Sequence, residues 1–192
     1  MESQTAQLRH ELEGGHDYEF VEGVLKAPMG EGLEALSSPG QSFYAYYDPK
    51  DPSTLFQTID HLDRYISTEG PFDIVMGFSA GAALAALYIL DRQRRGEPSP
   101  FKCGIFLSSA VSKAESAFLG LEGGSDNLIR IPTVHIWGSE DSTAPTGGED
   151  LCRLCDPNVR FTVVHDGGHE VPKKQYLIQA VNAIQRGLDL VD

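Results

Sequence analysis

The 192-residue sequence has no long apolar run. Nothing in it approaches the roughly 18 uninterrupted apolar residues that a membrane-spanning helix needs. The start, MESQTAQLRHELEGG, also lacks the basic and apolar blocks of a signal peptide. We therefore expect a soluble, cytoplasmic protein that binds no membrane.

Cysteine is scarce, with only three residues in the chain. Cys152 and Cys155 lie three positions apart in a segment expected to be helical, and no second pair is present to complete a zinc site. We expect buried thiols in a reducing compartment and no metal or other cofactor. A redox-active pair is the alternative.

Basic residues are also few: 15 Lys and Arg stand against 28 Asp and Glu, a net charge of −13. Such a charge repels phosphate backbones and anionic lipids. The densest basic run, Arg92, Arg94 and Arg95, suits the C-terminal end of a helix that Gly96 terminates. We therefore expect no nucleic-acid partner.

Apolar residues make up 41% of the chain, which is typical of a globular protein, and the length fits one domain over residues 1–192. Short apolar runs alternate with helical patterns, and a punctuated loop is expected over 24–41. The expected strands are Tyr18–Val21, Phe72–Met76, Phe101–Leu107, Ile131–Trp137 and Val159–Val164. The expected helices are Gln4–Leu12, one after Asp51 that ends at Gly70, Ala80–Arg95, and one that Pro172 opens.

Continuous apolar strands separated by amphipathic helices indicate a mostly parallel sheet with helices on both faces, the α/β class. In such sheets, functional residues gather in the loops beyond the carboxyl ends of the strands. These loops are where the chemistry is expected.

Residues 77–81 form the motif G-x-S-x-G between an expected strand and an expected helix. A serine on such a turn adopts a strained conformation that exposes its Oγ, and the first amide of the helix, that of Ala80, faces a developing oxyanion. Ser79 is therefore the candidate nucleophile. A helix-capping serine is the alternative.

A serine nucleophile needs a histidine base and a carboxylate that orients it, in the chain order serine, acid, histidine. His169 follows Gly167 and Gly168 in the loop before the last helix, and Asp141 follows the strand over 131–137. We predict His169 as the base and Asp141 as the acid. A structural histidine, a turn role for Asp141, and Glu140 as a reserve acid stay open.

The blocks GFSAGAALAAL, IPTVHIWGSEDSTAP and VVHDGGHEVP resemble the FSH family of serine hydrolases. That family includes fungal polyketide-releasing thioesterases and related eukaryotic esterases. The resemblance extends from about Gln4 to the C-terminus. It implies an α/β-hydrolase fold in which Ser79, Asp141 and His169 match the family's triad.

The same resemblance implies hydrolysis of carboxylic esters or thioesters, with an acyl-carrier protein or polyketide synthase as a partner for a releasing thioesterase. The aromatic cluster over 43–47 and the stretch 110–130 fall where the family shapes its pocket and lid. We expect Phe78, Tyr44, Tyr46 and Phe118 to line the substrate pocket. Carrier proteins are usually acidic, so the net charge favours small free esters or acyl-CoA-like substrates.

The chain departs from the family at its beginning. Family members start with a strand that ends in a His-Gly-rich loop, and that loop supplies the second oxyanion N–H. We expect this strand to be absent, with Ala80 the one identifiable donor. The gap would be filled by a longer natural chain, by pairing of the flanking strands, or by a second copy in a homodimer. A weakened or inactive hydrolase-fold binding protein is the alternative function.

Overall fold

The computed structural model describes residues 1–12, 15–29, 40, 42–48, 50–51, 53–111, 113–119 and 128–191. Its contacts divide the chain into two compact units. One is formed by Met1–Asp17 together with Gly70–Asp192, and the other by Tyr18–Glu69. The single domain indicated by the sequence stays a prediction.

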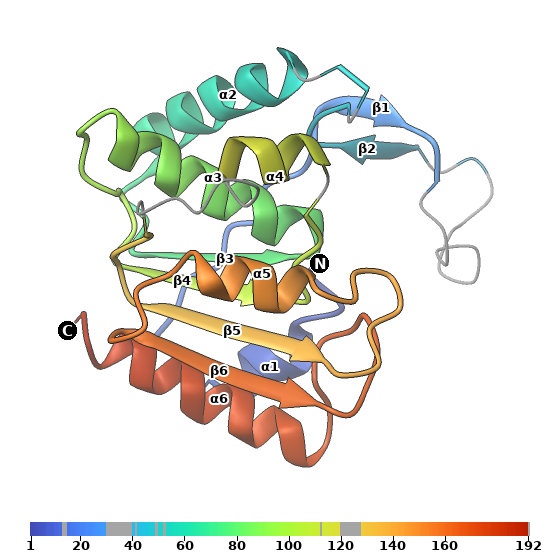
Figure 1. The fold of residues 1–192 in the computed structure, drawn as a ribbon, viewed down its shortest axis with the longest axis vertical. Coiled ribbons are helices and arrows are strands. Elements are labelled where there is room, and N and C mark those ends of the chain that lie inside the picture. Colours follow the sequence, from blue (N-terminus) through green and yellow to red (C-terminus); the bar gives the residue numbers. More distant parts are fainter. Residues whose placement is uncertain are drawn as a thin grey trace. The chain divides into compact units, whose positions relative to one another are not determined.

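The larger unit is built on a four-stranded parallel sheet in the order β3-β4-β5-β6 (Figure 1). Each strand lies within two residues of its predicted bounds. All five residues of β4 are buried, as expected for a parallel strand covered on both faces. The strands are β3 (Ile74–Phe78), β4 (Cys103–Leu107), β5 (Thr133–Gly138) and β6 (Arg160–His165).

One face of this sheet is covered by α1 (Ala6–Glu11) and α6 (Gln175–Leu188), which lie next to each other in Figure 1. Leu8 and Ile184 from these helices share one core cluster with Val134 of β5. Successive strand residues point to opposite faces, so every second side chain of β5 enters this core.

The opposite face is covered by α3 (Ala80–Arg94) and α5 (Gly147–Arg153). Residues 82–90 of α3 are all buried, because the sheet lies on one side of the helix and α4 (Lys113–Leu119) packs on another. The sequence predicted α3 but not α4. None of the helices formed by described residues is long and apolar enough to cross a membrane.

The smaller unit pairs β1 (Leu25–Ala27) antiparallel with β2 (Phe43–Ala45), with Lys26 opposite Tyr44. Its helix α2 (Ser53–Glu69) begins where the sequence predicted, and the Ser53 N–H donates to the Asp51 carboxylate at 3.0 Å. Leu55, Ile59 and Ile66 form the buried stripe of α2.

The strand predicted over Tyr18–Val21 is wrong. The structure assigns no regular secondary structure to these four residues, and Tyr18 and Val21 are exposed. The strand forms instead at Leu25–Ala27, inside the stretch predicted as a loop, because that segment is the one that pairs with β2. Residues 30–39 and 41 of the predicted loop lie outside the described residues.

The strand expected to be absent would lie beside β3. Within the described part of the sheet, β3 has a ladder partner on one side, β4, and is an edge strand. The absent strand, and the homodimer that could fill its place, stay predictions.

Candidate active site

Ser79 occupies the turn between β3 and α3. Its φ of 54° lies in the left-handed region, which non-glycine residues rarely adopt. The Ser79 N–H donates to the Leu107 carbonyl at 2.9 Å, and its own carbonyl accepts from the Ala82 N–H at 3.0 Å. A Cβ on Gly77 would stand 2.5 Å from backbone atoms of Ala82, so glycine is required for α3 to begin this close to β3.

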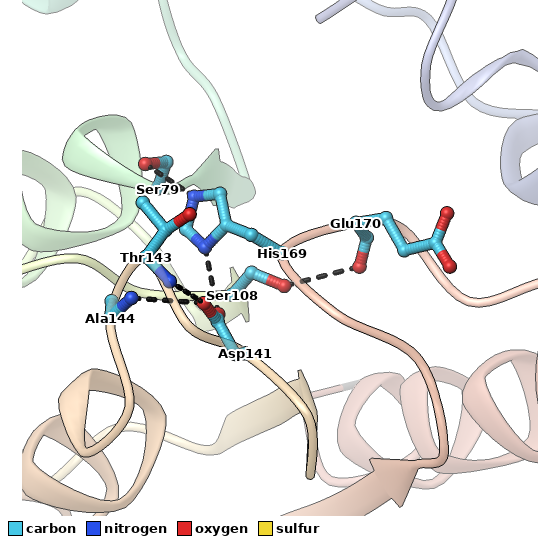
Figure 2. Close-up of polar contacts among 7 residues, drawn as sticks. All are labelled: Ser79, Ser108, Asp141, Thr143, Ala144, His169 and Glu170. Carbon is cyan, nitrogen blue, oxygen red and sulfur yellow. Dashed lines mark hydrogen bonds and ion pairs between the residues drawn. The ribbon is translucent and has the colours of Figure 1, made fainter. Parts of the chain in front are cut away.

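Three side chains from three loops meet at this turn, as Figure 2 shows. His169 Nε2 lies 2.8 Å from Ser79 Oγ, and His169 Nδ1 lies 2.7 Å from Asp141 Oδ2. A carboxylate only accepts hydrogen bonds, so Nδ1 carries the imidazole proton and Nε2 accepts from the serine hydroxyl. The structure therefore brings together all three residues that the sequence singled out.

The Asp141 carboxylate is held on both oxygens. Its Oδ1 accepts from the backbone N–H groups of Thr143 at 3.0 Å and Ala144 at 2.9 Å, while Oδ2 accepts from His169. The residue is 5% exposed. These bonds fix the direction in which the carboxylate faces the imidazole. Glu140, the reserve acid, is exposed.

The loop that carries Asp141 and the loop that carries His169 are joined through their main chains. The Ser139 N–H donates to the His165 carbonyl at 2.8 Å, and the Glu140 N–H donates to the Gly167 carbonyl at 3.1 Å. A Cβ on Gly138 would stand 2.0 Å from the Gly167 oxygen. Glycine at 138 therefore lets the two loops touch.

Ala80 is the first residue of α3, so its N–H is among those that the helix itself leaves free. It follows the serine directly, at the positive end of the helix dipole. This position suits a donor to an oxyanion formed at Ser79.

The four predicted pocket residues lie in different places. The Phe78 ring packs 5.2 Å from the His169 ring, centroid to centroid. The Phe118 ring lies on the guanidinium of Arg94, at the other end of α3 and about 20 Å along that helix from Ser79. The structure does not bring Phe118 to the serine. Tyr44 and Tyr46 belong to the smaller unit, and their place in a pocket stays a prediction.

Two other histidines of the larger unit are buried and outside this constellation. Burial lowers the pKa of His135 to about 3 and also lowers the pKa of His165. His135 Nε2 bonds with Thr133 Oγ1, and His165 Nδ1 accepts from the Gly167 N–H at 3.1 Å.

The three cysteines are free and buried. Burial raises the pKa of Cys103 and of Cys155 to about 12. Both are therefore thiols rather than reactive thiolates at neutral pH.

Sequence reasoning missed Ser108, which donates from its Oγ to the Glu170 carbonyl at 3.1 Å. The available signal was a pair of polar residues, Ser108 and Ser109, directly after a buried strand at the functional edge of the sheet. It also missed the amides at 143 and 144, for which the signal was an aspartate two and three residues earlier, as in an Asx turn.

The fold resembles that of solved α/β hydrolases. A CIB-like hydrolase from Thermoplasma acidophilum matches with a TM-score of 0.53 at 17% identity, covering 77% of this chain and 67% of that one. The mouse alpha/beta hydrolase domain-containing protein 10 matches with a TM-score of 0.54 at 10% identity, covering 72% and 70%. The protein is thus of the α/β-hydrolase fold class.

Sequence comparisons narrow this class to a family. The model of the family described as Serine hydrolase (FSH1) matches residues 1–181. The chain is 36% identical to Esterase FPY3 of Fusarium mangiferae over all of this chain and 89% of that protein. It is 31% identical to Esterase OVCA2 of Bos taurus, covering 88% and 81%. The chain belongs to the FSH1 family of serine hydrolases and is an enzyme with hydrolase activity.

Proposed function

We propose that the protein cleaves carboxylic esters or thioesters through an acyl-enzyme on Ser79. His169 acts as general base and then general acid, and Asp141 orients its imidazole. The observation that carries the proposal is the continuous hydrogen-bonded chain from Ser79 Oγ through both nitrogens of His169 to Asp141, at 2.8 and 2.7 Å.

The chemistry follows from this chain of contacts. Ser79 Oγ attacks the acyl carbon while its proton passes to His169 Nε2, and the Ala80 N–H donates to the oxyanion. The imidazolium then gives that proton to the leaving alcohol or thiol, which departs as the acyl-enzyme forms. In the second half of the reaction, His169 takes a proton from water, which attacks the acyl-enzyme. His169 then returns the proton to Ser79 Oγ, and the carboxylic acid and the free serine are released.

Among substrates, we favour small free esters or acyl-CoA-like thioesters over acyl chains on a carrier protein. Carrier proteins are usually acidic, and the net charge of −13 repels an acidic partner. The esterase names of the relatives agree with an ester as substrate. Saturable hydrolysis of carrier-bound acyl chains, with negligible turnover of short free esters, would reverse this preference and support a releasing thioesterase.

Labelling with a fluorophosphonate probe tests the nucleophile. We expect the protein to be labelled, Ser79→Ala to abolish labelling, and Ser79→Ala to lower ester turnover by up to about 10⁶-fold. Equal labelling of Ser79→Ala would show that the nucleophile is another residue. Labelling without turnover of any ester or thioester would support the alternative, a hydrolase-fold binding protein with a weak oxyanion site.

A further inference from the structure

The histidine loop, residues 165–170, is poorly suited by composition to hold a side chain still. Gly167 and Gly168 directly precede His169, and glycine has the largest conformational freedom to lose on folding. Yet the His169 ring makes hydrogen bonds at both nitrogens, at 2.7 and 2.8 Å. A catalytic side chain must be held to within about 0.5 Å of its working position. Contacts from outside the loop are therefore needed to fix the His169 imidazole.

Ser108 supplies such a contact from the end of β4. Its Oγ donates to the carbonyl of Glu170 at 3.1 Å, directly beyond His169 (Figure 2). The Glu170 N–H in turn donates to the Gly168 carbonyl at 2.9 Å. Both peptide groups of Glu170 are therefore anchored, and the backbone that leaves His169 is fixed.

Ser108 is itself rigidly placed. It is 1% exposed, its N–H donates to the Ile136 carbonyl at 2.7 Å, and its φ is 41°. A positive φ favours glycine, so serine at this position accepts backbone strain while its hydroxyl reaches the histidine loop. The other end of the loop is held by His165, whose Nδ1 accepts from the Gly167 N–H at 3.1 Å.

We propose that Ser108 is a positioning residue for His169, which acts by holding the Glu170 carbonyl and does not touch the substrate. This inference rests on the proposed function, in which His169 carries the proton from Ser79. Ser108 then affects how often the imidazole is aligned with Ser79, and leaves substrate binding unchanged.

Three substitutions separate the hydroxyl from the backbone strain. Ser108→Ala removes the hydroxyl; Ser108→Gly removes it and also suits the positive φ; Ser108→Cys keeps a weak donor of similar size. Ser109→Ala is the matched control, because Ser109 is the adjacent residue and is 2% exposed. Steady-state kinetics on a short ester, thermal unfolding and proton NMR are measured for each purified protein.

We expect Ser108→Ala and Ser108→Gly to lower kcat about 3- to 10-fold, the range set by one ordinary hydrogen bond, with KM within twofold. Ser108→Cys recovers part of the loss, and Ser109→Ala keeps the kcat of the parent enzyme. The downfield resonance of the proton between His169 and Asp141 broadens in Ser108→Ala and Ser108→Gly but not in Ser109→Ala. Ser108→Gly unfolds at no lower temperature than Ser108→Ala.

Wild-type kcat in Ser108→Gly, or a rise in KM at constant kcat, overturns the positioning role. A lower unfolding temperature without a change in kcat overturns it too, because it shows a purely structural hydroxyl. Ser79→Ala and His169→Ala are measured beside these variants. If those two retain turnover, the proposed function fails; if they lose it while the Ser108 variants keep it, only the present inference fails.

Discussion

The substitution Asp141→Asn tests whether the acid sets the tautomer of His169. In the structure, Asp141 Oδ2 accepts from His169 Nδ1, and Oδ1 accepts from the backbone N–H groups of Thr143 and Ala144. An asparagine has one acceptor oxygen and one donor NH₂ group, so it cannot serve both sides as the carboxylate does.

The two backbone amides decide which way the asparagine faces. With its oxygen toward Thr143 and Ala144, its NH₂ donates to His169 Nδ1, and the imidazole proton moves to Nε2, which can then no longer accept from Ser79. The opposite orientation turns the asparagine NH₂ toward the Thr143 and Ala144 N–H groups and loses both of their hydrogen bonds, each worth about 0.5–1.5 kcal/mol at this partly buried position. The unproductive tautomer is therefore favoured by about 1–3 kcal/mol, which corresponds to a loss of kcat between about 5-fold and 10²-fold.

The assay is kcat for ester hydrolysis at neutral pH, with thermal unfolding as the check that the variant is folded. Glu140→Gln is the control, because Glu140 adjoins Asp141 and its side chain is exposed. We expect this control to keep the parent kcat. A folded Asp141→Asn protein within threefold of the parent would refute the tautomer argument, and a larger loss in Glu140→Gln would move the role of the acid to Glu140.

Two further predictions concern a close contact between two loops of the site and a buried histidine outside it. Gly138→Ala places a Cβ 2.0 Å from the Gly167 oxygen, so we expect the acid and histidine loops to separate, with fluorophosphonate labelling slowed and stability lowered by about 1–3 kcal/mol; labelling at the parent rate would contradict this. Burial lowers the pKa of His135 to about 3, so on acidification the unfolded chain takes up this proton first, below pH 6.5. Neutral His135 therefore contributes about 5 kcal/mol to the free energy of unfolding above pH 6.5, and this contribution is lost as the pH falls to about 3. Urea unfolding at several pH values should show a shallower acid loss in His135→Leu, and identical slopes would show that His135 is not responsible.

The sequence could predict the sheet and the three polar side chains for one physical reason. Parallel strands place their carboxyl ends along one edge, so residues far apart in sequence but each directly after a strand must lie near one another. Ser79, Asp141 and His169 satisfy this condition. Their hydrogen bonds could therefore be anticipated without coordinates.

The errors have an equally physical origin. The segment Tyr18–Val21 has the composition of a strand, but pairing is decided by a partner distant in sequence, and β2 pairs with Leu25–Ala27. Phe118 was placed in the pocket by resemblance; its ring lies on Arg94, and its place in a pocket stays a prediction. The contact between Ser108 and Glu170 spans 62 residues, and no local pattern specifies which carbonyl a buried hydroxyl will find.

The reacting groups of the site were easier to predict than their positioning, because side chains supply the reacting groups and main-chain hydrogen bonds hold the loops that carry them. The reacting groups belong to side chains. By contrast, the hydrogen bonds from the Ser79 N–H to the Leu107 carbonyl and from the Glu140 N–H to the Gly167 carbonyl join main-chain groups, which every residue except proline could supply. In the sequence, these close backbone contacts are indicated only by glycines, Gly77 and Gly138, where a Cβ would meet backbone atoms. A backbone contact cannot be relieved by a change of rotamer, so the alignment of His169 with Ser79 depends on these glycines more than on exposed neighbours such as Glu140.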